Sequence, residues 1–228
     1  MKNYKFVTTI IVVSAVLMLF LTGCATESSR TVAGTETQAS RRVYTGPRSP
    51  IVVGRFENRS DFMRGIFSDG EDRLGGQAKT ILVSHLNLTN RFTVLDRDNM
   101  EQALREAQIR GTTQQLQGAT HIVTGDVTEF GRREVSDTQL YGILGRGKRQ
   151  VAYTKVMINI VDIRTSAIVY TVQGAGEYVL DSREIAGFGT SAGYDSTLNG
   201  KVLDLAIREA VDRLSEAIDA GAVNLAGR

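Results

Sequence analysis

The amino-terminal leader constrains where this chain folds more than any other stretch does. Lys2 and Lys5 precede an apolar run from Phe6 to Leu21, and small residues follow that run. A basic start, an apolar middle and small residues before a cleavage point form a bacterial export signal. The run holds about 16 residues, whereas a helix that spans a membrane needs roughly 20. We therefore expect residues 1–23 to be a signal peptide that is removed on export.

The only cysteine of the sequence lies at the end of this leader. Leu21-Thr22-Gly23-Cys24 is a lipobox, in which the leader is cut before Cys24 and acyl chains such as palmitate are attached to that residue. The alternative is an ordinary transmembrane anchor with a chance cysteine. Acylation at both the sulfur and the new amino group supplies more than the two lipid signals that stable anchoring requires. Because Ala25 follows, and not the Asp that retains lipoproteins in the inner membrane, we expect an anchor in the periplasmic leaflet of the outer membrane.

The net charge and the few cysteine and histidine residues limit which partners and metal sites the mature chain is expected to have. The full sequence has a formal net charge of +2, and loss of Lys2 and Lys5 with the leader removes that excess. The charge therefore gives no reason to expect nucleic acid as a partner. Acylation of Cys24 leaves no thiol for a disulfide or a thiolate metal site. His85 and His121 lie far apart in sequence, so we expect structural or surface roles for them and no metal ion.

Nothing in the sequence predicts an enzyme. The glycine-rich stretch Gly142–Gly147 is followed by Lys148 and Arg149, which does not fit the Gly-Lys-Ser/Thr order of a phosphate-binding loop. Ser, His and Asp residues are scattered without the elbow motif of a hydrolase. Asp96 and Asp98 flank an expected helix start, where capping explains them. We expect no catalytic residue and no cofactor.

Composition divides the mature chain into three parts. Residues 24–49 are rich in Ser, Thr, Arg, Gly and Ala without an apolar period, which is typical of a flexible tether that follows the lipidated residue. Residues 50–221 carry alternating and helical hydrophobic patterns, so we expect them to form a periplasmic domain. Residues 222–228 are a carboxy-terminal tail. The mature chain of about 205 residues fits one compact domain.

Hydrophobic spacing within residues 50–221 predicts strands and helices in a definite order. A strand, a helix, a strand and a second helix are followed by three strands and a closing helix. This order is typical of an α+β fold, a small sheet with helices on one face. The predicted strands are 51–56, 92–95, 120–130, 151–163 and 167–171, and the predicted helices are 74–88, 97–107 and 200–219. In the second helix the apolar stripe consists of Met100, Ala103, Leu104 and Ala107.

Two segments with glycine-rich centres, 131–150 and 172–199, do not fit this core. Their length and the alternation of their side chains predict two β-hairpin excursions, 131–154 and 173–196. Each is long enough for two strands of about 9–11 tilted residues, the length that crosses a membrane. Four strands cannot close a barrel, since the smallest has about eight, so insertion would require an oligomeric transmembrane β-barrel. The alternative is a pair of mobile glycine-rich loops on a soluble periplasmic domain.

Four stretches of the chain resemble the CsgG/HfaB family of lipoproteins, typified by the curli secretion channel. They are the lipobox, Phe92–Arg97, Ile122–Val127 and the hairpin Ile158–Val169 with Thr165 and Ser166 at its turn. The resemblance implies an outer-membrane lipoprotein that forms a ring homo-oligomer, nonameric in type, around a shared transmembrane barrel. It implies ATP-independent export of unfolded amyloid or adhesin subunits, aided by a periplasmic accessory cap protein. The alternative is a structural lipoprotein that anchors or activates a surface adhesin, holdfast or envelope complex without a pore.

In the channel members of that family, a loop after the first strand from every subunit meets at the axis and forms a narrow constriction. By this resemblance the segment 60–72 would line the pore. Its candidate constriction residues are Phe62, Met63, Ile66, Phe67 and Asp69. The typical channel carries a Tyr and an Asn-Phe pair in this loop, and this sequence has neither between residues 60 and 73. The alternative is that Phe62 or Phe67 packs against a helix.

Overall fold

The computed structural model describes residues 36–62, 71–138, 146–184 and 198–225. The chain divides into two compact units, Met1–Gly34 and Thr35–Arg228. Every described residue belongs to the second unit. Cys24, the predicted site of lipidation, therefore lies outside the described residues.

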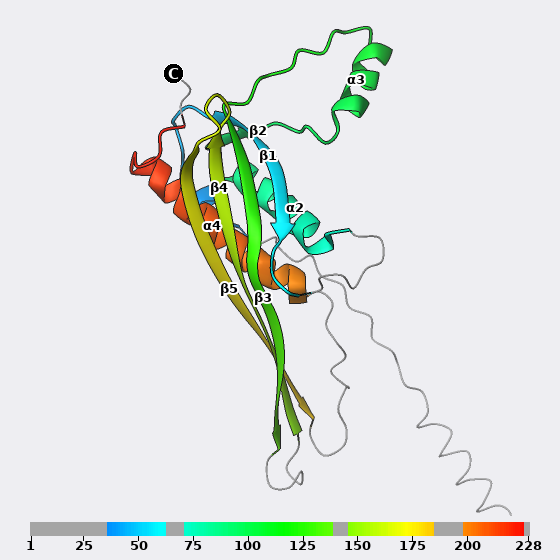
Figure 1. The fold of residues 1–228 in the computed structure, drawn as a ribbon, viewed down its shortest axis with the longest axis vertical. Coiled ribbons are helices and arrows are strands. Elements are labelled where there is room, and N and C mark those ends of the chain that lie inside the picture. Colours follow the sequence, from blue (N-terminus) through cyan, green and yellow to red (C-terminus); the bar gives the residue numbers. More distant parts are fainter. Residues whose placement is uncertain (1–35, 63–70, 139–145, 185–197, 226–228) are drawn as a thin grey trace, which may run out of the picture. The chain divides into compact units, whose positions relative to one another are not determined.

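One five-stranded sheet organises the described part of the second unit (Figure 1). The strand order is β2, β1, β3, β4, β5. β1 pairs in parallel with β2 and β3, whereas β4 pairs antiparallel with β3 and β5. Along the chain the elements are η1 (Ala39–Arg41), β1 (Ser49–Asn58), α2 (Arg73–Leu88), β2 (Phe92–Val94), α3 (Met100–Ile109), β3 (His121–Thr138), β4 (Arg146–Asp162), β5 (Ile168–Glu184) and α4 (Leu198–Asp219).

The predicted α+β fold is confirmed, and each predicted strand and helix has a counterpart in the same order. The largest difference is the length of the last three strands. β3 has 18 residues, and β4 and β5 have 17 each. These strands continue into the two segments that the sequence separated from the core.

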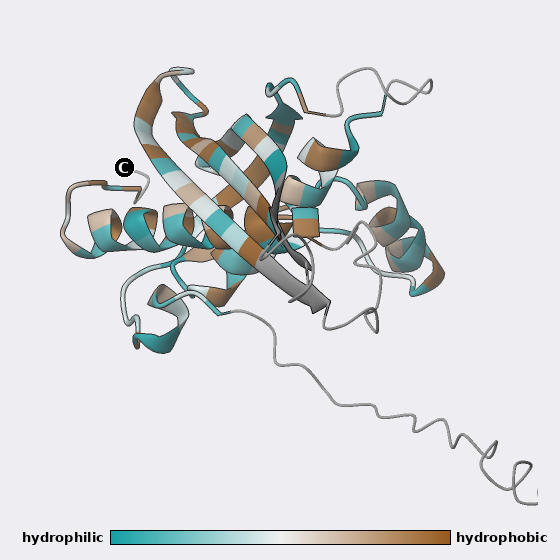
Figure 2. Cartoon of the chain, turned by 90° about the horizontal axis from the view of Figure 1, so that it is seen from below, coloured by the Kyte–Doolittle hydropathy of each residue, from teal (hydrophilic) through white to brown (hydrophobic). Residues whose placement is uncertain are grey.

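Helices α2 and α4 cover one face of the sheet and form the hydrophobic core with it. On β4, Val156, Ile158 and Ile160 are spaced by two residues, and each is 0% exposed. Figure 2 shows the matching alternation of hydrophobic and hydrophilic residues along the strands. From α4, side chains such as Val202 and Ile207 are buried in the same hydrophobic core. Burial of each large apolar side chain stabilises the fold by about 1.5–3 kcal/mol.

Helix α3 forms where it was predicted, but it does not join this helical layer. None of its residues is buried, and Leu104 from the predicted apolar stripe is 46% exposed. Figure 1 shows α3 apart from the sheet, within the connection between β2 and β3. Among the described helices, α2 and α4 are thus the ones that cover a face of the sheet. Among the described helices, none has the length and the hydrophobicity that crossing a membrane requires.

Residues 37–39, predicted as part of a flexible tether, are held against the domain instead. The carboxylate of Asp212 on α4 accepts the backbone N–H groups of Gln38 at 3.1 Å and of Ala39 at 2.8 Å. Thr37 and Ala39 are buried, and β1 already begins at Ser49. The sequence did not predict this contact because these few residues carry no hydrophobic period.

The predicted carboxy-terminal tail also begins inside the domain. Val223 is 7% and Leu225 is 3% exposed, and both belong to the hydrophobic core. The hydroxyl of Ser49 donates a hydrogen bond to the carbonyl oxygen of Leu225 at 3.2 Å. The domain therefore extends beyond residue 221 to at least Leu225.

Candidate functional site

Strands β3, β4 and β5 continue together beyond the helices. β3 pairs with β4 without interruption from Gly131 to Thr138, and β4 pairs with β5 as far as Glu184. Figure 1 shows the three strands running past the amino-terminal end of α4. We call residues 131–138, 146–153 and 177–184 the ribbon. The pairing of its first two strands agrees with the predicted hairpin 131–154, whose insertion into a membrane stays a prediction.

The segment 173–196 was predicted to form a second hairpin, and the structure describes only its first half. Residues 173–184 belong to β5, whereas 185–196 lie outside the described residues. The predicted alternation is present, since Val172 and Gly174 are buried and Gln173 is exposed. The inward face packs against α4, however, so the first part of this segment belongs to the domain core.

Two glycines allow α4 to lie close to the backbone of β5. A Cβ atom on Gly174 would overlap the carbonyl oxygen of Ala206, and one on Gly176 would lie 2.8 Å from the carbonyl oxygen of Val202. Real side chains do not tolerate such contacts with backbone atoms. Two glycines at alternate strand positions are the sequence signal that could have indicated this helix contact.

Arg132 connects the base of the ribbon to the amino-terminal end of α4. Its guanidinium donates hydrogen bonds to the Asn199 side-chain oxygen at 3.3 Å and to the Gln150 side-chain oxygen at 3.0 Å. Gln150 is 8% exposed. An arginine facing lipid at mid-depth would cost about 2–4 kcal/mol, and these polar partners place Arg132 in the domain side of the ribbon instead.

Both edges of the ribbon lack a partner strand among the described residues. β1 pairs with β3 only as far as Val127, so the outer backbone groups of β3 beyond it face no described strand. β5 is the last strand of the sheet on the other side. Unpaired strand edges are templates for pairing with another chain.

The loop after β1 is closed at its base by Asp72. The backbone N–H of Asn58 donates to one Asp72 carboxylate oxygen at 2.6 Å, and the N–H of Gly75 donates to the other at 2.8 Å. Asp72 thus caps α2 and holds the end of β1 at the same time. The side chain of Asn58 also donates to the carbonyl oxygen of Phe62 at 2.8 Å.

Phe62 belongs to the described residues and lies beside the sheet. Its ring centroid is 4.4 Å from that of Phe130 on β3, and it packs against the hydrophobic core. The alternative to a constriction role was packing against a helix, and Phe62 instead packs against Phe130 of a strand. The other candidate constriction residues lie outside the described residues: Met63, Ile66, Phe67 and Asp69.

A buried arginine that the sequence did not reveal, Arg91, contacts Ala39 and Tyr44, which precede β1. Arg91 is 2% exposed, and it donates to the two carboxylate oxygens of Asp219 at 2.9 and 2.5 Å. It also donates to the carbonyl oxygen of Ala39 at 3.2 Å, and its guanidinium lies 4.9 Å from the centroid of the Tyr44 ring. The hydrogen bonds from Arg91 lower the pKa of the Asp219 carboxyl below its ordinary value.

These features define a class of protein, an α+β domain whose sheet continues as a ribbon with no partner strand at its edges among the described residues. The family model described as "Curli production assembly/transport component CsgG" matches residues 33–226. The chain belongs to this family, and the predicted family membership is confirmed.

Relatives of known sequence and structure are similar to this chain to different degrees. A protein described as "Putative lipoprotein NMB1126/NMB1164", from Neisseria meningitidis serogroup B, is 61% identical over 218 residues, which are 96% of this chain and 97% of the relative. Lipoprotein GNA1162 from Neisseria meningitidis is 17% identical with a TM-score of 0.34, covering 77% of this chain and 99% of that structure. The hypothetical protein CT253 from Chlamydia trachomatis is 13% identical with a TM-score of 0.39, covering 76% and 99%. A PelC dodecamer from Paraburkholderia phytofirmans is 12% identical with a TM-score of 0.36, covering 80% and 95%.

Proposed function

We propose that this chain is an outer-membrane lipoprotein, anchored at Cys24 and facing the periplasm, that assembles into a ring with a shared β-barrel pore. Its substrates are unfolded amyloid or adhesin subunits, which cross without ATP and with the aid of a periplasmic accessory cap protein. The observation that carries this proposal is the ribbon. Three strands continue past the helices, and neither outer edge has a partner strand among the described residues.

Strand direction sets a condition on this assembly. β3 and β5 both run antiparallel to β4, so they are parallel to each other. If copies joined through these two edges, β5 of one copy would pair in parallel with β3 of the next. Transmembrane barrels are antiparallel. The proposal therefore requires residues 185–196 to return as a fourth strand, as the hairpin 173–196 was predicted to do.

A second candidate function is a structural lipoprotein that anchors or activates a surface adhesin, holdfast or envelope complex without a pore. The observation that favours it is the extent of α4. Helix α4 packs against β5 at Gly176 and extends to Tyr178, where the Lys201 ammonium lies 5.2 Å from the ring centroid, and Asn199 of α4 accepts a hydrogen bond from Arg132 at the base of the ribbon. The described strand length beyond these contacts, up to Thr138 and Glu184, falls short of the about 9–11 residues that a spanning strand needs.

Within the pore proposal, the loop after β1 forms the constriction. Its candidate residues are Met63, Ile66, Phe67 and Asp69. Phe62 is better assigned to packing, since its ring lies against Phe130. The hydrogen bond between Asn58 and Asp72 supports the proposal because it holds the two ends of the loop together at 2.6 Å.

Electron microscopy and a dye-release assay with acylated protein test the proposal. Full-length protein, processed and acylated in a bacterial host, is extracted in detergent, imaged, and then added to liposomes loaded with dye. The pore predicts rings with a membrane belt and dye release. A matched control is Cys24→Ala, which removes the anchor and is expected to reduce release. Single acylated copies together with sealed liposomes would contradict the pore and leave the structural lipoprotein.

A further inference from the structure

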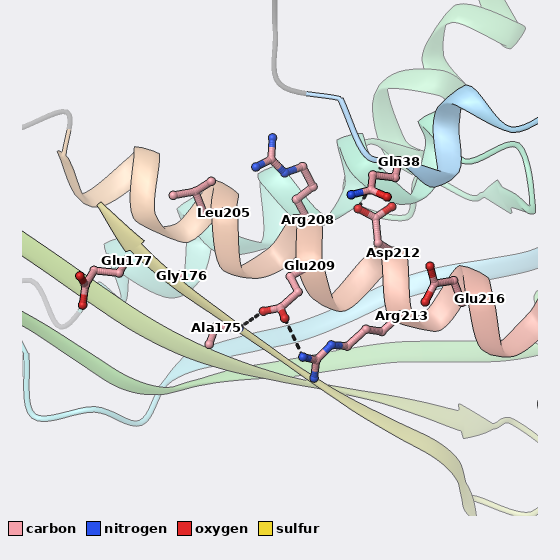
Figure 3. A pocket seen from close by; sticks show the side chains of 10 residues that line it. All are labelled: Gln38, Ala175, Gly176, Glu177, Leu205, Arg208, Glu209, Asp212, Arg213 and Glu216. Atoms are coloured by element: carbon pink, nitrogen blue, oxygen red, sulfur yellow. Dashed lines mark hydrogen bonds and ion pairs between the residues drawn. The ribbon is translucent and has the colours of Figure 1, made fainter. Parts of the chain in front are cut away.

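The main polar groups of the groove along α4 are paired within the chain. This groove encloses about 430 Å³, and Figure 3 shows its side chains, which come mainly from one stripe of α4. Glu209 accepts the backbone N–H of Ala175 at 2.6 Å, and Asp212 accepts that of Ala39 at 2.8 Å. Because these carboxylates already have partners in the fold, the groove gives no reason to expect a ligand.

A groove beside α3 is different, because it is largely apolar and no described element covers it. It encloses about 500 Å³ between α3 and residues 112–116. Met100 and Leu104 line it from the helix, and Leu116 lines it from the connection to β3. Both leucines are exposed. We call these three residues the α3 groove.

A helix as short as α3 needs a surface to pack on. It has 10 residues, whereas isolated helices shorter than about 12–15 residues are only marginally stable in water. Most of the stability of a helix in a protein comes from packing of its apolar face. No residue of α3 is buried in the described part of one copy, so we expect its packing surface outside that part.

The base of α3 is fixed at the β2 edge of the sheet. Asp98, just before the helix, pairs with Lys79 of α2 at 2.6 Å, and Leu95 donates its backbone N–H to the carbonyl oxygen of Ile51 at 2.8 Å. Figure 1 shows α3 on the side of the sheet where β2 lies. In the strand order, β4 and β5 are three and four positions from β2, at about 4.8 Å for each position. The helix is therefore held away from β4 and β5 of its own copy.

The other side of the sheet carries a second uncovered apolar surface, at the turn between β4 and β5. Ile163, Ile168 and Val169 are 43%, 60% and 47% exposed, and we call them the turn patch. Ile168 pairs with Val161, whose neighbour Ile160 is buried under the helices. Because side chains alternate along a strand, the turn patch lies on the face of the sheet that α2 and α4 leave open.

We propose that the α3 groove of one copy packs on the turn patch of the next copy. Neither surface contains an ionised side chain, so burial of one against the other removes apolar area from water and leaves no charge unpaired. Each copy supplies one of each surface, and the two lie on opposite sides of the sheet. Such a head-to-tail contact repeats from copy to copy until a ring closes. This inference rests on the ring assembly of the proposed function, and it does not require a pore.

Cysteine crosslinking of full-length acylated protein tests this contact. Acylation uses the only native thiol, that of Cys24, so introduced cysteines are the free ones. Leu104→Cys and Ile168→Cys chains with different tags are produced together, extracted in detergent and oxidised. We expect a covalent heterodimer from the mixture, no dimer from either chain alone, and a ladder of multimers from a chain with both changes. Gln102→Cys with Ile168→Cys is the matched control and should give no heterodimer, because residues two positions apart on a helix do not face the same way.

A charge within the contact provides a second measurement. Leu104→Glu is expected to convert rings into single copies in electron microscopy of the detergent extract, whereas Gln102→Glu should leave the rings intact. Persistence of rings in Leu104→Glu would overturn the proposal, as would single copies of the parent or parent rings without a heterodimer.

Two other crosslinking results would identify a different partner for α3 and so overturn the proposal. Dimers of Leu104→Cys alone would show that α3 meets α3 of another copy. A disulfide within the doubly changed chain, without a ladder, would show that α3 covers the turn patch of its own copy. Failure of the pore is distinguishable, because a ladder together with sealed liposomes keeps the contact and removes the pore.

Discussion

Arg91 is charged and almost fully buried, so its partner carboxylate decides whether it stabilises the domain. Loss of one member of a buried ion pair leaves an uncompensated charge, at a cost of about 3–5 kcal/mol. The Asp219 side chain is 32% exposed, which places its loss at the lower end of that range. We expect Asp219→Ala to lower the free energy of unfolding by about 3 kcal/mol. Urea unfolding of the Cys24→Ala chain at neutral pH, with and without this change, measures the difference.

The same pair predicts how stability depends on pH. Because Arg91 lowers the pKa of Asp219 in the folded chain, the ionised carboxylate stabilises the fold. This contribution is complete above the pKa of an unfolded aspartate, about 3.9, and is lost as the pH falls through the lower folded value. The difference between parent and Asp219→Ala should therefore shrink below about pH 4. Asp98→Ala is the control, since the ion pair of Asp98 with Lys79 is exposed and contributes less than about 1 kcal/mol. If both variants lowered the free energy of unfolding equally, the stabilising role of the Arg91–Asp219 pair would be contradicted.

Local residue chemistry was visible in the sequence, and distant pairing was not. The turn after β4 was predicted at Thr165 and Ser166, and there the Asp162 carboxylate accepts the backbone N–H groups of Arg164 at 2.8 Å and Thr165 at 3.0 Å. These partners are two and three residues away. Arg91 and Asp219 are separated by 128 positions, so no spacing rule marks them as a pair.

Hydrophobic spacing predicted the helices and strands well, because in most of them the side chains that the period places on one side are the ones that are buried. Helix α3 is the exception, since an amphipathic pattern shows which side is apolar but not whether anything packs against it.

Alanine substitutions at Leu104 of α3 and Leu82 of α2 test whether each apolar stripe is packed. Leu82 on α2 is 0% exposed, so we expect Leu82→Ala to cost about 2–5 kcal/mol. In urea unfolding of the monomeric protein, Leu104→Ala should lower the free energy of unfolding by less than about 1 kcal/mol. If Leu104→Ala lowered it as much as Leu82→Ala does, α3 would pack on the domain after all.

The contact between α4 and β5 makes a second prediction at the scale of elements. A Cβ atom on Gly174 would overlap the carbonyl oxygen of Ala206 and lie 2.7 Å from the amide nitrogen of Ala210. Since these are backbone atoms, relief requires α4 to move. We expect Gly174→Ala to cost about 3 kcal/mol or somewhat more, with a matching fall in melting temperature. Gly118→Ala is the control, because no atom lies within 4 Å of its Cβ position; equal stability of the two variants would exclude the tight contact.

At the scale of the whole molecule, the sequence predicted that helices pack on a sheet. It did not predict at which residues the strands extend beyond the helices. Alternation in residues 172–178 fits a strand that faces lipid as well as one that faces a helix. Only the position of α4 distinguishes the two, and that position depends on Gly174 and Gly176 meeting Ala206 and Val202. The period of a strand therefore identifies its two faces, whereas the partner of each face comes from the tertiary fold.

The proposed pore is tested by two phenylalanines that follow β1, Phe62 and Phe67. If Phe67 lies at the constriction, Phe67→Ala widens it, so single-channel conductance in a planar bilayer should rise while stability stays unchanged. Phe62 stacks on Phe130 with centroids 4.4 Å apart. Phe62→Ala should leave conductance unchanged and lower the free energy of unfolding by about 1–3 kcal/mol. The opposite result, with conductance sensitive to Phe62 and not to Phe67, would move the constriction to the base of the loop, where Asp72 and Asn58 already join its ends.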